Sequence, residues 1–240
     1  MIVEVCANSF QSAINAENSG ADRIELCAEL AVGGITPSFG LIKKTIENLN
    51  IPVHVLIRPR SGDFTYSDDE FEIMKENIRL CRQLGVSGIV SGVLFADSTL
   101  DKTRTGELRT TAGDLYFTFH RAFDWVTEPV NTLFELEGLG VDCVLTSGGK
   151  NSAEEALPKL ISWKKMTSKI AIMPGGGIRE NNAPLFKEND FKVIHLSGVS
   201  FRKTLLKTPQ ISMNNASHLK DDELAITEPE IIRAVIRSVK

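Results

Sequence analysis

Strand-like and helix-like runs alternate along the whole chain, and this alternation limits the possible folds more than any other feature of the sequence. Eight short apolar runs read as strands, at residues 2–6, 23–26, 53–58, 88–92, 116–120, 143–146, 169–173 and 193–196. Strands that alternate with helices form a parallel sheet joined by crossover helices. Eight such units in 240 residues predict an α/β fold with one domain over residues 1–240, a closed (β/α)8 barrel of the TIM type.

A short sequence repeat supports this count of strands. The repeat starts with a glycine, at Gly20, Gly85 and Gly140, and each copy follows a helix-like stretch and leads into a strand-like run. Glycine is common just past the end of a helix, so each repeat has the form of a helix-to-strand connection. After the eighth run the pattern loosens. Residues 205–226 are polar without a period, and we expect a loosely structured loop or interface arm there, before a last helix.

The composition narrows the class of partner. The formal net charge is −4, and no segment is rich in lysine or arginine, so we expect neither nucleic acid nor an anionic membrane as the main partner. No apolar run approaches the roughly 18 residues that span a bilayer, and the first residues carry no targeting signature. We therefore expect a cytoplasmic protein that binds small molecules or metal ions, with its four cysteines present as reduced thiols.

The first two strand-like runs carry the same polar pattern. Glu4 and Cys6 alternate with apolar residues in the first run, and Glu25 and Cys27 repeat this in the second. Successive side chains on a strand point to opposite faces, so both glutamates and both cysteines are expected to point into the barrel. The same alternation predicts four more ionisable side chains inside, namely His54, Arg58, His120 and His195.

Ionisable groups are costly to bury unless they are paired, so this concentration of charge needs a cause. One interpretation is a structural network in which Arg58 neutralises one or both glutamates. The other is a ligand or metal site at the carboxyl ends of the strands, where barrels of this type carry their active sites. For catalysis we assign Glu4 or Glu25 as the base, His120 as the acid, and Arg58 or Arg60 as the clamp for an anion.

Glycine-containing turns follow the last three strand-like runs. Their N–H groups can bind an anion such as phosphate, which barrels of this type often hold near strands seven and eight. Glycine is also the common residue of tight turns, so both interpretations stay open. The residues that we expect to contact a ligand at this end of the barrel are Arg60, Asp124, Ser147, Gly148, Gly175, Gly176, His195 and Ser197.

Cys6 and Cys27 end neighbouring strands on the same predicted face, so their sulfur atoms can share one ion. Two soft thiolates with few other ligands suit Cu(I), whereas Zn(II) usually takes four ligands. The alternative is that both cysteines are small side chains that fill space at the rim. The spacing of the residues does not decide between these interpretations.

Several ordered motifs make residues 1 to about 200 resemble the CutC family. They are Glu4-Val-Cys, Ala21-Asp-Arg-Ile-Glu-Leu-Cys, Gly33-Gly-Ile-Thr-Pro-Ser, Val55-Leu-Ile-Arg-Pro-Arg, Thr118-Phe-His-Arg-Ala-Phe-Asp and Met173-Pro-Gly-Gly-Gly-Ile. The resemblance implies a cytoplasmic (β/α)8 barrel, often oligomeric, that is named for copper homeostasis, and it assigns copper to Cys6 and Cys27. We expect a homo-oligomer, most simply a dimer.

Two functional hypotheses follow. The first is a protein of copper homeostasis that binds Cu(I) through Cys6 and Cys27. The second is an enzyme that acts on a small metabolite, phosphorylated metabolites included, by acid–base chemistry of the inward glutamates and histidines. The sequence favours neither strongly enough to exclude the other.

Overall fold

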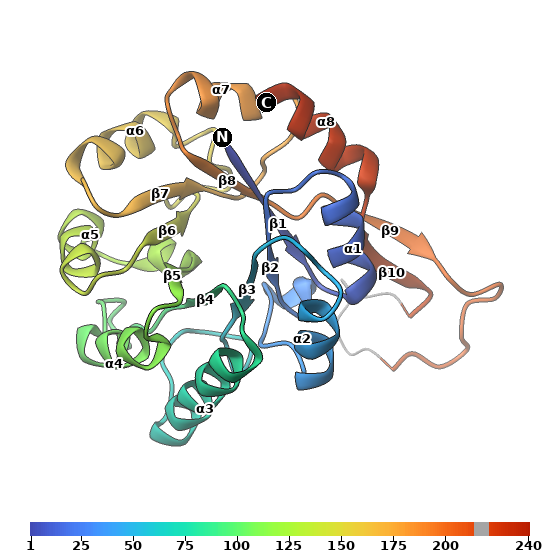
Figure 1. Cartoon of the computed structure of the whole chain (residues 1–240), viewed down its shortest axis with the longest axis horizontal. Coiled ribbons are helices and arrows are strands. Elements are labelled where there is room, and N and C mark those ends of the chain that lie inside the picture. The colour runs from blue at the N-terminus through green and yellow to red at the C-terminus, as the bar shows by residue number, and fades with distance from the viewer. Residues whose placement is uncertain (214–220) are drawn as a thin grey trace.

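Eight parallel strands form the centre of the computed structural model, which describes residues 1–213 and 221–240. The strands are β1 (Ile2–Ala7), β2 (Arg23–Leu26), β3 (Val53–Leu56), β4 (Gly88–Ser91), β5 (Tyr116–Phe119), β6 (Cys143–Thr146), β7 (Ala171–Pro174) and β8 (Val193–Leu196). Each strand from β1 to β7 pairs with the next in the chain, and β8 pairs with β1. A bridge between Gly175 and His195 joins the two remaining edges, so the sheet closes into the predicted barrel (Figure 1).

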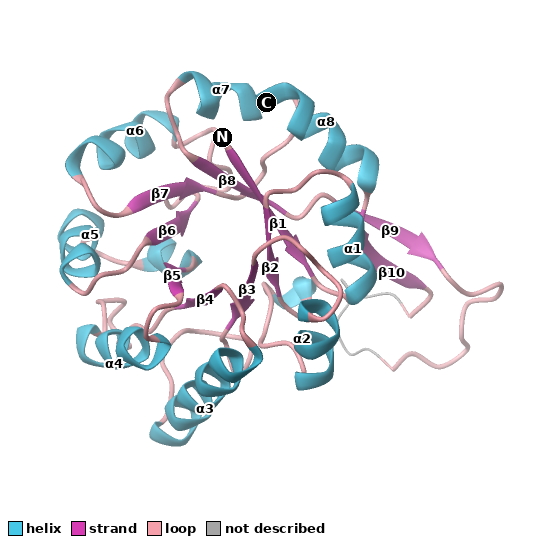
Figure 2. Cartoon of the chain, viewed as in Figure 1, coloured by secondary structure: helices cyan, strands magenta, loops and turns pink. Residues whose placement is uncertain are grey.

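Helices surround the strands, as Figure 2 shows with strands in magenta inside and helices in cyan outside. The α-helices of the described chain are α1 (Phe10–Asn18), α2 (Phe39–Ile46), α3 (Asp68–Leu84), α4 (Lys102–Ala112), α5 (Pro129–Gly138), α6 (Leu157–Met166), α7 (Ala183–Glu188) and α8 (Pro229–Val239). Short 3-10 turns at Leu30–Val32 and Arg121–Trp125 follow β2 and β5. No helix in the described part of the chain is both long and apolar enough to cross a membrane.

The main apolar core lies between the barrel and the helices. Val3 and Val5 of β1, with Ile24 and Leu26 of β2, are completely buried in this layer. Burial of each such side chain contributes roughly 1.5–3 kcal/mol. Since these residues face outward, the side chains between them on the same strands must face into the barrel, as the sequence pattern predicts.

The helix ends show how local sequence sets the boundaries. Ser67 and Glu70 form a capping box at the start of α3, in which each side chain binds the backbone N–H of the other residue. Gly85 ends the helix at φ 76°, a conformation that glycine adopts without strain. These two signals fix the start and the end of α3. The loop before α3, residues 57–67, lies beside the mouth of the barrel.

The chain after β8 differs in part from the prediction. Residues 223–226, expected to lie in a loosely structured segment, belong to strand β10 (Glu223–Thr227), which pairs antiparallel with β9 (Val199–Lys203). Thr227 is anchored to α1, because its N–H donates to Ser12 Oγ at 3.1 Å and its carbonyl accepts from Asn15 Nδ2 at 2.9 Å. Residues 204–213 contain no helix or strand, and residues 214–220 lie outside the described part of the chain.

Candidate functional site

Glu4 lies at the centre of a buried ionic network inside the barrel. One carboxylate oxygen is 2.5 Å from Arg23 Nε, and the other is 2.8 Å from His195 Nδ1. His54 Nδ1 is 3.7 Å from the oxygen that Arg23 contacts. Burial alone would raise the pKa of Glu4, but the hydrogen bond with His195 and the charge of Arg23 lower it to about 2. Glu4 is therefore negatively charged near pH 7 and holds the side chains of Arg23 and His195.

Arg23, which was not among the predicted site residues, is the counter-ion of Glu4. The prediction that Arg58 neutralises a glutamate is wrong, because Arg58 Nη1 donates to the carbonyls of Val32 and Gly34, and Nη2 donates to that of Gly62. Strand β3 ends at Leu56, so the alternation of side chains no longer applies at position 58. Arg23 and Glu25 are two residues apart on β2, so their side chains point to the same face of the strand. This alternation could be seen in the sequence.

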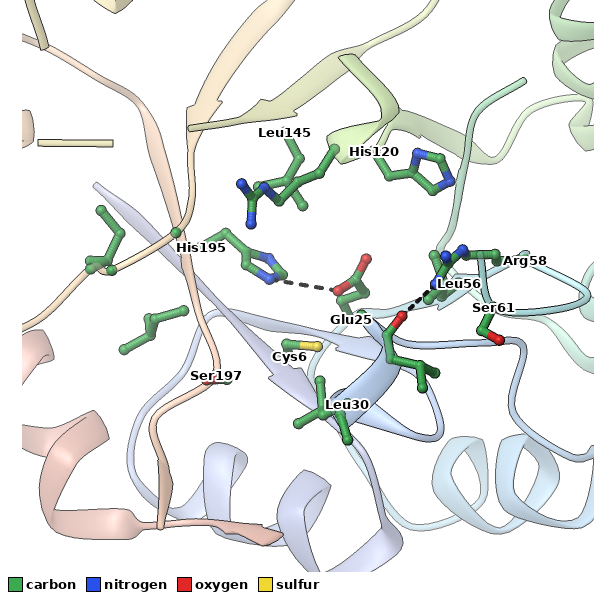
Figure 3. Close-up of a pocket in the computed structure, with 18 of the residues that line it drawn as sticks. Cys6, Glu25, Leu30, Leu56, Arg58, Ser61, His120, Leu145, His195 and Ser197 are labelled. Carbon is green, nitrogen blue, oxygen red and sulfur yellow. Dashed lines mark hydrogen bonds and ion pairs between the residues drawn. The ribbon is translucent and has the colours of Figure 1, made fainter. Parts of the chain in front are cut away.

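A cavity of about 750 Å³ opens at the carboxyl ends of the strands (Figure 3). Cys6, Glu25 and His195 lie at its inner end, and the apolar side chains of Leu30 and Leu145 form parts of its wall. A volume of this size suits a small molecule. The predicted site residues that line the cavity are Cys6, Glu25, Arg58, His120, Gly176, His195 and Ser197, and those that do not are Glu4, Cys27, Arg60, Asp124, Ser147, Gly148 and Gly175.

Glu25 and His195 face each other across the inner end of the cavity. His195 Nε2 is 3.6 Å from Glu25 Oε2, while its Nδ1 is held by Glu4. Burial raises the pKa of Glu25. Burial opposes the charged form of His195, but the hydrogen bond with Glu4 and the charge of Glu25 raise the pKa of its imidazole overall. The two groups are therefore an acid–base pair in contact with the cavity.

Cys6 and Cys27 converge as the sequence predicts. Their Sγ atoms are 3.5 Å apart, and both side chains are buried. The register explains this, because Cys6 lies opposite Glu25 on β2 and Cys27 follows two residues later. The contact with Cys27 and burial both raise the pKa of the Cys6 thiol. Among the described residues, Cys6, Glu25 and His195 form the one set of three possible metal ligands, with ligand atoms within 4.8 Å of one another.

A match to known proteins assigns the family. The model described as the CutC family matches residues 1–200, a stretch that includes all eight barrel strands. The chain belongs to the CutC family. A CutC family protein of Salmonella typhimurium is 42% identical over 221 residues, which are 92% of this chain and 88% of the relative. That of Salmonella typhi is also 42% identical, over 92% of this chain and 84% of the relative.

Solved structures agree with this assignment. The putative copper homeostasis protein CutC from Streptococcus agalactiae superposes with a TM-score of 0.77 and 31% identity, over 81% of this chain and 97% of that chain. Thiamine phosphate pyrophosphorylase from Pyrococcus furiosus has a TM-score of 0.60 at 12% identity, over 99% of this chain and 95% of that chain. The second likeness shows the barrel fold alone, whereas the first is a family relationship.

His120 of this CutC-family chain is buried directly after β5, beside an aromatic ring. Its Nδ1 accepts the N–H of Ala122 at 3.2 Å, and its ring lies 4.8 Å from that of Phe64. Burial and the charge of Arg58 lower the pKa of His120 to about 3. The imidazole is therefore neutral near pH 7.

The predicted anion site after β6 is occupied by the protein itself. Asp124 Oδ1 accepts from Thr146 Oγ1 at 2.5 Å and from the N–H groups of Ser147 and Gly149 at 3.0 Å each. The N–H of Gly148 donates to Thr146 Oγ1 at 2.8 Å. These donors are already satisfied, so the prediction that Ser147 and Gly148 bind an anion through their backbone is not supported.

Two other predicted ligand residues lie in structural positions. Arg60 Nε is 2.6 Å from Glu70 Oε1, and Arg60 Nη2 is 3.0 Å from Asp63 Oδ1, so its guanidinium joins the loop before α3 to that helix. The N–H of Gly175 donates to the carbonyl of Thr146 at 3.0 Å, which is part of the pairing near the end of β7. Neither residue lines the cavity.

Proposed function

We propose that this member of the CutC family binds Cu(I) through Cys6 and Cys27 and acts in copper homeostasis. The observation that carries the proposal is the 3.5 Å separation of the two Sγ atoms, with ligand atoms of Glu25 and His195 within 4.8 Å of Cys6. Thiolate sulfur and imidazole nitrogen are both suitable ligands for copper. Copper is here the cargo of the protein.

The distance between the sulfurs indicates which kind of site would fit. With metal–sulfur bonds of about 2.3 Å, a linear arrangement would need the sulfurs about 4.6 Å apart. The observed 3.5 Å is shorter, so the pair fits a bent arrangement, which leaves room for a third ligand. His195 is the better third candidate, because its imidazole is a softer ligand than the carboxylate of Glu25. Binding would release protons from the thiols.

The experiment is an anaerobic titration of Cu(I) against a coloured competing chelator. Wild type is expected to take one equivalent per chain, and Cys6→Ala and Cys27→Ala are expected to lose most of this affinity. Cys143→Ala is the matched control, since Cys143 is also buried inside the barrel but does not line the cavity. Circular dichroism of each variant would verify that it folds. Equal affinity in wild type and the Cys6→Ala/Cys27→Ala double variant would refute the proposal.

A second candidate is an enzyme that acts on a small metabolite by acid–base chemistry. It is favoured by one observation, the contact of Glu25 and His195 at the inner end of a 750 Å³ cavity. Their pKa values are both raised by their surroundings. A carboxyl with a raised pKa can accept or donate a proton closer to neutral pH. In this candidate, Glu25 is the base, His195 is the acid, and Glu4 fixes the orientation of the imidazole.

The second candidate can be tested by thermal shift with a library of small metabolites. A ligand of the cavity must raise the unfolding temperature, because it binds only the folded state. A compound that stabilises wild type and is consumed by it, but is not consumed by Glu25→Gln, would support the candidate. If a broad library contains no stabilising compound, the candidate loses its basis.

We also propose that the protein is cytoplasmic and forms a homodimer. Large apolar side chains are exposed on the arm that we define as residues 199–213 and 221–227, which projects from the barrel beside α1 (Figure 1). Contiguous exposed apolar surface commonly marks a contact with another protein. The most exposed apolar residues of the arm are Phe201, Leu206, Ile211 and Met213.

A further inference from the structure

Arg121 is held in a fixed orientation at the rim of the cavity. It follows β5 directly, in the 3-10 turn Arg121–Trp125. Its Nε donates to Asp124 Oδ2 at 2.8 Å, and its Nη2 donates to Ser147 Oγ at 2.9 Å. The same Asp124 carboxylate binds the loop after β6, so this support is itself fixed. Two of the three guanidinium nitrogens are thereby used, and Nη1 donates to no other described residue.

The free edge of Arg121 lies beside Gly176, which lines the cavity. A Cβ atom built on Gly176 would be 3.8 Å from Arg121 Nη1, and the backbone has φ 99° there, so a larger residue is disfavoured.

Arg179, three residues after Gly176, is exposed. Of its guanidinium nitrogens only Nη1 is hydrogen-bonded within the described chain, and it donates to the carbonyl of Ile178 at 2.9 Å. Within the described chain, the N–H of Gly177 has no acceptor. The rim after β5 and β7 thus presents several donors.

The charge of the cavity is opposite to that of the whole chain. Three arginines line it, Arg58, Arg121 and Arg179, against one lining carboxylate, Glu25, and a second carboxylate, Asp124, which is paired with Arg121. The chain overall has a formal net charge of −4. A cavity with an excess of positive charge concentrates anions. Guanidinium groups bind phosphate oxygens in pairs, and donors that approach from two loops match the several oxygens of one phosphate better than the two oxygens of a carboxylate.

We infer that the mouth of this cavity binds the phosphate group of a small phosphate monoester, between Arg121 and Arg179 and beside Gly176 and Gly177. The rest of the molecule extends inward to Glu25 and His195. This deepens the second candidate function by naming its substrate class, and it rests on that candidate only for the reaction that follows binding. Asp124 and Ser147, which the sequence selected as ligand residues, are positioning residues that orient Arg121.

Calorimetric titration of the full chain with inorganic phosphate, glycerol phosphate and glycerol tests the inference. Wild type is expected to bind one equivalent of either phosphate compound and no glycerol. Arg121→Gln and Arg179→Gln should each weaken binding about tenfold or more, since each removes a charge-assisted hydrogen bond. Ser147→Ala should weaken it less than Arg121→Gln. Arg237→Gln, which removes an exposed charge of α8 outside the cavity, should bind like wild type.

Each alternative result has a definite meaning. The inference is overturned if neither phosphate compound binds saturably, if acetate or succinate competes as well as phosphate does, or if Arg237→Gln weakens binding as much as Arg121→Gln. Binding of inorganic phosphate without glycerol phosphate would also overturn it, because the monoester would not fit. Phosphate binding with the expected variant pattern, but without turnover of any phosphorylated compound, would leave the inference standing and remove the enzyme candidate.

Discussion

Arg23 Nε lies 2.5 Å from Glu4 Oε2 inside the barrel, where both side chains are almost completely removed from solvent. The two residues are direct neighbours in the pairing of β1 with β2, so the register of the sheet itself brings them together. Arg23 also lies 5.0 Å from the centre of the Tyr116 ring. The pair anchors the network that orients His195 toward the cavity.

Replacement of Arg23 by methionine should destabilise the fold strongly. It leaves the charge of Glu4 buried without its guanidinium partner, and the loss of one member of a buried pair costs about 3–5 kcal/mol. The free energy of unfolding from urea titration measures this. Glu4→Gln/Arg23→Met should cost less than the two single changes added together, because it removes both charges. A loss below about 1 kcal/mol in Arg23→Met would contradict the ion pair's role.

The stability of the protein should fall with acid through His120. Its pKa is about 3 in the folded protein, against about 6.5 in an unfolded chain. The unfolded state therefore binds a proton first, and stability that is complete above pH 6.5 is lost as the pH falls toward 3. Between pH 7 and pH 5 this contribution is about 2 kcal/mol.

His120→Gln removes that titration while its side-chain oxygen can still accept the N–H of Ala122. Urea titrations of both proteins at pH 7 and pH 5 give the comparison. Wild type should lose about 2 kcal/mol more than the variant over this interval. Parallel losses in the two proteins would show that His120 is already protonated in the folded state or that its pKa is unperturbed.

Alkylation should distinguish Cys6 from Cys81 and Cys143. Cys6 lines the cavity, whereas Cys81 and Cys143 are completely buried and do not line it. Burial raises the pKa of all three thiols, so access through the cavity sets the order of reaction. In the native protein, iodoacetamide should react first at Cys6, and one equivalent of Cu(I) should suppress this reaction. Mass spectrometry of the tryptic peptides measures both. Labelling of Cys81 or Cys143 before Cys6 would show that Cys6 is not the most accessible of these thiols.

The exposed arm gives a test of the proposed dimer. Phe201→Ser with Leu206→Ser removes two of its most exposed apolar side chains. Light scattering should give the mass of two chains for wild type and of one chain for the variant. Phe95→Ser is the control, since Phe95 is 51% exposed but lies outside the arm. A wild type that is monomeric at high concentration would reject the dimer.

Side-chain alternation was sufficient to predict much of the site. The convergence of Glu4, Glu25 and His195, and the contact of Cys6 with Cys27, follow from strand parity and a parallel register. Arg23 was missed although it obeys the same rule. Arg23 is the first residue of β2, and its guanidinium lies inside the barrel against Glu4.

Residues beyond the strand ends could not be placed in this way. Arg58 lies in a loop and Asp124 in the 3-10 turn after β5, and in both places neighbouring backbone groups decide the orientation of the side chain. The sequence shows a glycine turn after β6 but not that Asp124 fills it. The same limit explains β10, whose pairing depends on contacts with α1 that are more than 200 residues distant in the chain.

Binding of Cu(I) by Cys6 and Cys27 can be measured by X-ray absorption at the copper edge of the protein loaded with one equivalent. We expect two sulfur neighbours and one nitrogen or oxygen neighbour around copper. In Cys27→Ala one of the sulfur neighbours should disappear. A copper ion surrounded by nitrogen and oxygen alone in wild type would rule out binding by the two thiolates.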